Sequence, residues 1–191
     1  MIKRFEYANG IVNITINEKP MYSDLEVEFK KIMTNIKSLD FQRLPNSLGL
    51  EIGIHKGGRI YYGLLSTSIL PSCDVDTTYL TVSFTKRNIR IFENSILLNN
   101  NHIYEGLPEE YLDAVINGAF TSITEINRFP LCNIAFDHAA NCTVGSSPMF
   151  FEKISGAIID LIFLSHKNEL SIETCDEYLL KKFNLRTKMR E

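Results

Sequence analysis

The chain has 191 residues, of which 45% are hydrophobic and 23% charged, a composition usual for a folded protein. Its formal net charge of -3 argues against a dedicated nucleic-acid binder, which carries a strong basic excess, but leaves room for a small local basic patch. The length is enough for one large domain or two small ones.

Membrane segments and bound metals are not expected. No run of about 18 apolar residues occurs, and the first residues lack the apolar stretch of a signal peptide, so we expect a cytoplasmic protein without a membrane partner. The cysteines have neither CxxC nor His-rich spacing, which predicts free thiols and no metal site. They are Cys73, Cys132, Cys142 and Cys175, and a Cys132–Cys142 bond is the alternative.

The N-terminal part predicts two strands and a helix. Residues 5–7 and 11–16 are expected to be strands, and Asn9-Gly10 between them is the strongest short signal of a β-hairpin. Apolar residues at three- and four-residue spacing predict a helix over residues 23–37. This β-β-α segment is either a small separate subdomain or an extension of the sheet that follows.

The next part of the chain is rich in alternating apolar and polar residues, which predicts an antiparallel sheet. The first two strands are joined by a short loop that can fold back as a hairpin, and the last two are expected to pair as a further hairpin. The expected strands are residues 48–55, 61–70, 79–84, 88–92 and 95–98, and the hairpin loop is 56–59.

A long amphipathic helix is predicted to begin at Pro108. Proline suits the first helical position because its missing N–H would have no partner there, and the carboxylates of Glu109 and Glu110 suit the positive end of the helix dipole. Gly118 lowers the helix propensity in the middle of this segment. We therefore expect another backbone to approach the helix closely at Gly118.

A second helix follows after a strand and a turn. Residues 131–136 predict a short buried strand, and the small polar residues 138–143 predict a turn. Ser147 and Pro148 are a good N-cap and a good first residue for the second helix. Both long helices have one apolar face, which predicts that they pack on the same sheet. A third amphipathic helix is expected over residues 171–183.

This order of motifs resembles domain IV of the elongation factor G family. That domain has a Gly-Gly-Arg-x-x-Tyr-Gly loop, a Pro-Lys-Glu-Tyr helix start, a Gly-Phe-Pro corner, and a second helix start with Ser-Ser and Met. The resemblance covers roughly residues 50–164, with residues 70–87 as an insertion. The matching residues are Gly57, Gly58, Arg59, Tyr62, Gly63, Pro108, Glu110, Tyr111, Ala114, Val115, Gly118, Phe129, Pro130, Val144, Ser146, Ser147, Met149 and Phe151.

The resemblance implies an α+β fold. Residues 48–166 are expected to form a ribosomal protein S5 domain 2-like β-sheet with helices packed on one face. Residues 1–47 are then an N-terminal hairpin-helix extension, and residues 167–191 a C-terminal amphipathic helix with a basic tail. That tail is either a solvated run of charges or a contact for phosphates.

Catalysis and cofactor binding are not expected. The sequence contains no Walker A pattern, so the chain should not be a GTPase. Cys142 lies near His138 in sequence, but a Cys–His pair also needs an orienting group and an oxyanion site. Glu109 and Glu110 are adjacent on a helix and cannot face each other across a substrate.

The elongation factor G family inserts the tip of domain IV into the ribosomal decoding centre. The resemblance therefore implies RNA contacts at Lys56, Arg59, Tyr61, Asn141 and Cys142. In the family the second loop of the tip carries a histidine and an aspartate, whereas this chain has Cys142 and Gly145 there, so full translocation activity is not expected.

Two functions from different classes remain open. The first is a non-enzymatic module, derived from a translation factor, that binds the ribosome or RNA through a basic tip around Arg59. The alternative is a protein-binding inhibitor, of the antitoxin or immunity type, that meets a basic partner through acidic side chains. The acidic side chains in question are Asp74, Asp76, Glu109 and Glu110.

Overall fold

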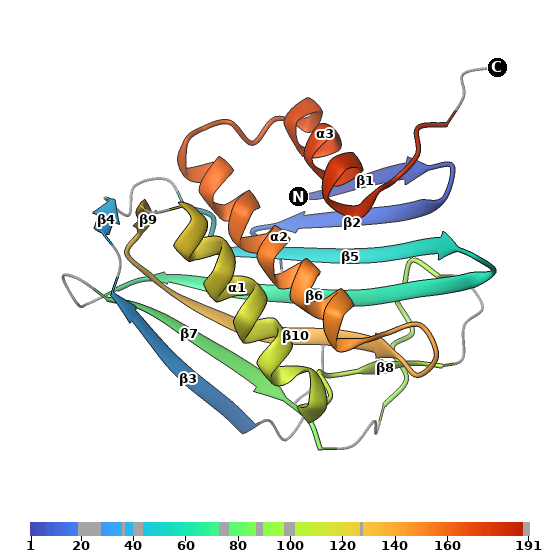
Figure 1. The fold of residues 1–191 in the computed structure, drawn as a ribbon, viewed down its shortest axis with the longest axis horizontal. Helices are drawn as coiled ribbons and strands as arrows, with labels where there is room; N and C mark the ends of the chain where they lie inside the picture. Colours follow the sequence, from blue (N-terminus) through green and yellow to red (C-terminus); the bar gives the residue numbers. More distant parts are fainter. Residues whose placement is uncertain are drawn as a thin grey trace.

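A computed structural model describes most of the chain and shows an α+β fold (Figure 1). The described residues are 1–18, 28–35, 37–39, 44–72, 77–86, 90–97, 102–126 and 128–188. In chain order the elements are β1 (Ile2–Tyr7), β2 (Gly10–Ile16), β3 (Glu28–Asn35), β4 (Lys37–Leu39), β5 (Ser47–Lys56), β6 (Arg59–Pro71), β7 (Thr77–Phe84), β8 (Ile103–Glu105), the 3-10 helix η1 (Glu109–Tyr111), α1 (Leu112–Ile126), β9 (Arg128–Pro130), β10 (Cys132–Cys142), α2 (Pro148–His166) and α3 (Ile172–Phe183).

One large mixed sheet organises the molecule. Its strand order is β1-β2-β5-β6-β10-β7-β3, with β8 added beside the second half of β10. The pair β10–β7 is parallel and the other pairs of this sheet are antiparallel. The hairpin of β1 and β2 extends the same sheet, because β2 pairs with β5 from Gly10–Ile54 to Ile16–Leu48. Strands β4 and β9 form a separate small parallel pair.

The three α-helices cover one face of this sheet (Figure 1). Successive side chains of a strand point to opposite faces, so one set in each strand packs under the helices. Leu50 and Ile52 of β5 lie in this main core with Phe151 and Ile158 of α2 and Leu179 of α3. The long helices α1 and α2 run side by side, as the shared apolar faces predict.

The opposite face of the sheet carries a second, smaller core. Tyr62 and Leu64 of β6 point to this face, and residues 90–97 together with β8 cover them. The buried members of this second core are Tyr62, Leu64, Phe92, Ile96, Ile103, Ala140 and Cys142. Both faces of the central strands are therefore partly covered, which explains why β5 is buried along most of its length.

The chain crosses from β7 to the parallel strand β10 through α1. With the helices toward the viewer and both strands pointing right, β10 lies above β7 in Figure 1, which makes this crossover left-handed. Right-handed crossovers are far more common. The connection is long, because the chain passes through β8 and η1 before α1 begins. No helix in the described part of the chain is both long enough and apolar enough to cross a membrane.

The predicted helix over residues 23–37 is wrong where the structure describes it. Residues 28–35 form β3, which pairs antiparallel with β7 from Glu28–Phe84 to Asn35–Thr77, and residues 37–39 form β4. The free edge of β7 offers a row of backbone donors and acceptors, and pairing with it outweighs local helix propensity. Residues 19–27, where this helix was expected to begin, lie outside the described part.

The predicted turn at residues 138–143 is also wrong, because β10 continues through Cys142. The strand pairs with β6 on one side and with β8 on the other, and a bulge between Phe136 and His138 shifts the register. The polar side chains that suggested a turn have local partners instead: His138 Nδ1 lies 2.7 Å from Asp137 Oδ1, and Asp137 accepts a hydrogen bond from Ser68.

Two smaller expectations need correction. The segment 90–97 does not form the expected hairpin, since Phe92 and Ile96 pack onto the far face of the sheet instead of pairing with one another. Pro108 precedes the 3-10 helix η1, and the α-helix α1 begins only at Leu112. The N-cap role of Ser147 and the first position of Pro148 in α2 are confirmed.

Candidate nucleic-acid interface

The β5–β6 hairpin carries two cations next to its turn. Gly57 and Gly58 form a two-residue turn with φ of 59° and 75°, a left-handed conformation that favours glycine. Lys56 and Arg59 face each other across the strands on either side of this turn, and both are exposed. The tight turn therefore fixes the spacing of two positive side chains at the tip of the hairpin.

The turn between β10 and α2 lies against the start of β6. The backbone N–H of Tyr62 donates to the carbonyl oxygen of Gly145 at 3.1 Å. The Ser146 hydroxyl donates to the carbonyl oxygen of Tyr62 at 2.7 Å and accepts from the N–H of Cys142 at 2.7 Å. These bonds bring together the two loops that the sequence motifs indicated separately. Val144 in this turn is 82% exposed, which is unusual for an apolar side chain.

A groove of about 200 Å³ separates the hairpin from the helices at this end. One wall comes from β5 and β6, and the other from the start of α2 and the end of α3. The residues that line it are Ile54, Lys56, Tyr61, Ser147, Met149, Phe150, Lys153, Phe183 and Asn184. The centres of the Tyr61 and Phe150 rings lie 6.1 Å apart, so the two walls are in aromatic contact at the groove.

The groove has a positive character. Lys153 lies 5.4 Å from the centre of the Phe183 ring, where partial burial lowers the pKa of its ammonium group, and the charges of Lys182 and Lys56 lower it further. Arg59 is the cross-strand partner of the lining residue Lys56, and the N-terminus of α2 adds the positive end of a helix dipole. No carboxylate occurs among the described residues that line the groove.

The structure separates the predicted contact residues into two groups. Lys56 and Arg59 are exposed, and Tyr61 is half-buried beside them. Asn141 is 2% exposed and donates to the carbonyl oxygens of Gly106 at 3.0 Å and Tyr104 at 3.5 Å. Cys142 is 6% exposed. The side chains of Asn141 and Cys142 are therefore largely buried, and Asn141 supports the loop through its bonds to the backbone.

Sequence reasoning missed two residues of the groove, Lys153 and Met149. They lie four residues apart at the start of α2, which places them on the same side of the helix. Met149 is 76% exposed. The sequence feature that could have indicated these residues is the N-cap at Ser147. It fixes where α2 begins, and hence which side chains in the first two turns of α2 border the tip.

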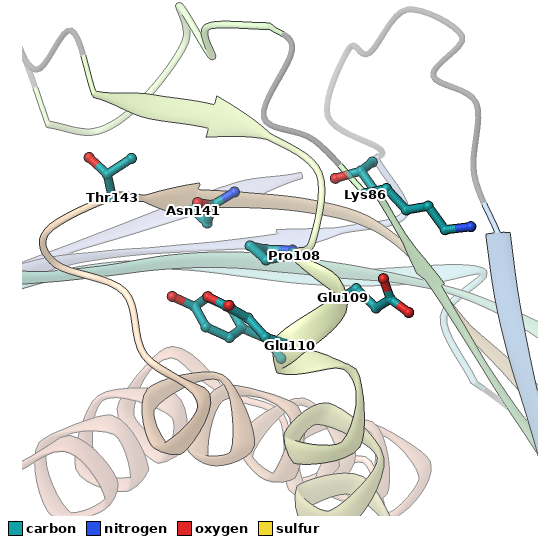
Figure 2. Close-up of a pocket in the computed structure, with 8 residues that line it drawn as sticks. Lys86, Pro108, Glu109, Glu110, Asn141 and Thr143 are labelled. Carbon is teal, nitrogen blue, oxygen red and sulfur yellow. The ribbon is translucent and has the colours of Figure 1, made fainter.

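A second, open pocket of about 590 Å³ lies on the other side of the β10–α2 turn (Figure 2). Its lining residues are Thr85, Lys86, Pro108, Glu109, Glu110, Tyr111, Asn141 and Thr143. Figure 2 shows Glu109 and Glu110 at the start of the helix, below Lys86 and Asn141. Burial raises the pKa of the Tyr111 hydroxyl, and the charge of Glu110 adds to the effect. Asp74 and Asp76, which were expected to join an acidic face, lie outside the described residues.

In comparisons with known proteins, no protein-family model, no curated protein and no solved structure matches this chain.

Proposed function

We propose that this chain is a non-enzymatic module that binds RNA or the ribosome through the tip formed by the β5–β6 hairpin and the β10–α2 turn. The single observation that carries the proposal is that Lys56 and Lys153 line one groove beside Tyr61, with Arg59 directly across the hairpin from Lys56. Positive side chains at such spacing neutralise phosphates, and an aromatic face can stack on an unpaired base.

The resemblance to domain IV of elongation factor G gives independent support. That family contacts RNA through two loops, and the corresponding loops of this chain lie against each other, joined by the bonds between Tyr62, Gly145 and Ser146. The arrangement of α1, β10, a turn and α2 on one face of a sheet is compatible with the ribosomal protein S5 domain 2-like fold that the resemblance implies.

The proposed contact is electrostatic and of modest strength. Each phosphate that the groove neutralises contributes about -0.7 to the slope of log K against log salt for single-stranded RNA, so three contacts predict a slope of about -2. Cys142 and Gly145 stand where the family has polar side chains, and Cys142 is buried. We therefore expect binding without strong sequence preference.

Co-sedimentation with 30S and 70S ribosomal particles, at low and high salt, tests the proposal. A fluorescent single-stranded RNA provides a second readout for the salt slope. The triple variant Lys56→Ala, Arg59→Ala, Lys153→Ala should lose binding at low salt. A control variant, Arg128→Ala with Lys167→Ala, removes two exposed cations at the other end of the helices and should bind as the parent does. The double variant Lys56→Ala, Arg59→Ala, which removes the same number of charges at the tip, should bind more weakly than this control. Absence of binding by the parent at low salt, or full binding by the triple variant, would refute the proposal.

A second candidate function is the capture of a basic protein, as an antitoxin- or immunity-type inhibitor would do. The observation that favours it is the pair of exposed carboxylates, Glu109 and Glu110, at the open pocket of Figure 2. The two functions make opposite predictions for charge variants. Glu109→Gln with Glu110→Gln should leave RNA binding unchanged or slightly stronger, whereas it should weaken the binding of a basic protein partner.

A further inference from the structure

A polar pocket opens on the sheet face that points away from the helices. Two rows of side chains cross β2, β5 and β6 on this face: Asn13, Glu51 and Leu64 are direct cross-strand neighbours, and so are Thr15, Gly49 and Ser66. The flanking residues Leu50 and Ile14 belong to the main core under the helices, so the alternation of the strands places both rows on the opposite face.

The missing side chain of Gly49 creates the floor of this pocket. A Cβ atom at Gly49 would lie 2.3 Å from Thr15 Oγ1 and 2.9 Å from Ser66 Oγ. The hydroxyl groups of these two neighbours therefore occupy the space that a side chain at Gly49 would need. The pocket has a volume of about 330 Å³, and Phe92 and Asn94 of the segment 90–97 border it. This size is at the lower end of the range for small-molecule sites.

Glu51 places a carboxyl group on one side of the pocket. Its Oε1 atom accepts hydrogen bonds from the Tyr62 hydroxyl at 2.8 Å and from the backbone N–H of Ile96 at 2.9 Å. Only 7% of the residue is exposed. Glu18 adds a second carboxylate at the rim, where the N-terminal ammonium group of Met1 pairs with it at 2.6 Å. Neither lysine nor arginine occurs among the described residues that line the pocket.

Two polar atoms in the pocket wall have no hydrogen-bond partner within the described part of the chain. They are Ser66 Oγ, on a fully buried residue, and Asn13 Oδ1. A buried polar atom without a partner destabilises a fold, so such atoms usually mark the place of a bound group or of ordered water. Both atoms can accept a hydrogen bond.

We propose that this pocket binds a small molecule that carries a protonated primary amine on a short apolar body. An ammonium group has three donors and no acceptor, so it can satisfy Asn13 Oδ1 and Ser66 Oγ together while its charge faces Glu51. Leu64 and Phe92 provide an apolar surface for the rest of the molecule. This site is separate from the basic groove, and its ligand has the opposite charge to the phosphates proposed there.

Three probes of equal length separate charge recognition from simple filling of the pocket. The labelled full chain is titrated with n-butylamine, n-butanol and butyrate at neutral pH, and backbone amide signals are followed by NMR. The amine should shift the signals of Asn13, Glu51 and Ser66 in a saturable way. The alcohol should bind about tenfold more weakly, because it lacks the charge, and butyrate should not bind.

Two variants test the assigned contacts. Ser66→Ala removes a hydroxyl that has no described partner, so the protein should stay as stable as the parent while its affinity for the amine falls severalfold. Glu51→Gln should remove the preference for the amine over the alcohol. Ser83→Ala, in β7 and away from the pocket, is the matched control and should leave binding unchanged. Equal shifts with all three probes, no saturable shift with the amine, or unchanged affinity in Ser66→Ala would overturn the proposal.

Discussion

Gly118 of α1 lies directly against the backbone of α2: a Cβ atom at Gly118 would stand 2.0 Å from the carbonyl oxygen of Glu152. The two helices can pack this closely because Gly156 of α2 faces the carbonyl oxygen of Gly118 in turn, 3.2 Å from its own would-be Cβ. The close approach confirms the reason that the sequence suggested for a glycine inside a helix.

The first prediction concerns this contact. Gly118→Ala should improve helix propensity by about 1 kcal/mol, but the added methyl group meets a backbone atom that cannot rotate away. Overpacking of this kind costs about 1–3 kcal/mol. We therefore expect a lower midpoint in urea unfolding. Asn117→Ala, on the exposed neighbouring position of the same helix, should raise the midpoint slightly. A Gly118→Ala variant more stable than the parent would show that the packing cost is smaller than the gain in helix propensity of about 1 kcal/mol.

The second prediction concerns the start of α2. The Ser147 hydroxyl accepts a hydrogen bond from the N–H of Phe150 at 3.3 Å. Ser147→Ala should lower the free energy of unfolding by about 1 kcal/mol, because the Phe150 N–H loses its side-chain acceptor and keeps only the Ser147 carbonyl oxygen. Ser147→Asp should keep most of the stability, since its carboxylate can accept the same bond. If the aspartate variant is no more stable than the alanine variant, the side chain does not act as a cap.

The third prediction separates support from contact at the tip. Asn141 holds the carbonyl oxygen of Gly106, so Asn141→Ala should lower the free energy of unfolding by about 1–3 kcal/mol. Lys56→Ala should leave stability within about 0.5 kcal/mol of the parent, because its side chain is exposed. Chemical unfolding of both variants measures this difference. Equal stability of the two would mean that the Asn141 amide is not needed to hold the loop.

The fourth prediction concerns pH. Burial raises the pKa of the Glu51 carboxyl above its ordinary value of 4.5, although hydrogen bonds from Ile96 and Tyr62 oppose the shift. The folded protein therefore binds a proton at Glu51 more tightly than the unfolded chain does. Its contribution to stability is fully present below pH 4.5 and is lost as the pH rises through the raised pKa.

Unfolding of the parent and of Glu51→Gln in urea between pH 4 and pH 8 checks this sign. The parent should lose stability relative to the glutamine variant as the pH rises through this window, because glutamine carries no charge to bury. A difference that does not change with pH, or that changes in favour of the parent at high pH, would show that the hydrogen bonds outweigh burial.

Local sequence patterns were enough to predict the parts of the fold whose conformation depends on residues adjacent in the chain. The segment Ala8-Asn9-Gly10 predicted the β1–β2 hairpin, although the turn is Ala8-Asn9 and Gly10 is the first residue of β2. Gly57-Gly58 predicted the hairpin at the tip, and Ser147 the start of α2. At these last two places the conformation follows from the backbone freedom or hydrogen-bonding capacity of one or two residues. The exposed candidates at the tip, Lys56 and Arg59, followed from the same hairpin signal.

Pairing between residues far apart in the chain determined the other parts of the fold. Residues 28–35 have helical spacing, yet they form β3 because the edge of β7 supplies their backbone partners, and β10 continues past Asp137 because β6 and β8 pair with it on both sides. Burial of Asn141 and the approach of Lys153 to Lys56 also join residues far apart in the chain. The partner of a backbone hydrogen bond and the surroundings of a charged side chain depend on residues that the fold brings close. A local pattern of residue types does not identify those residues.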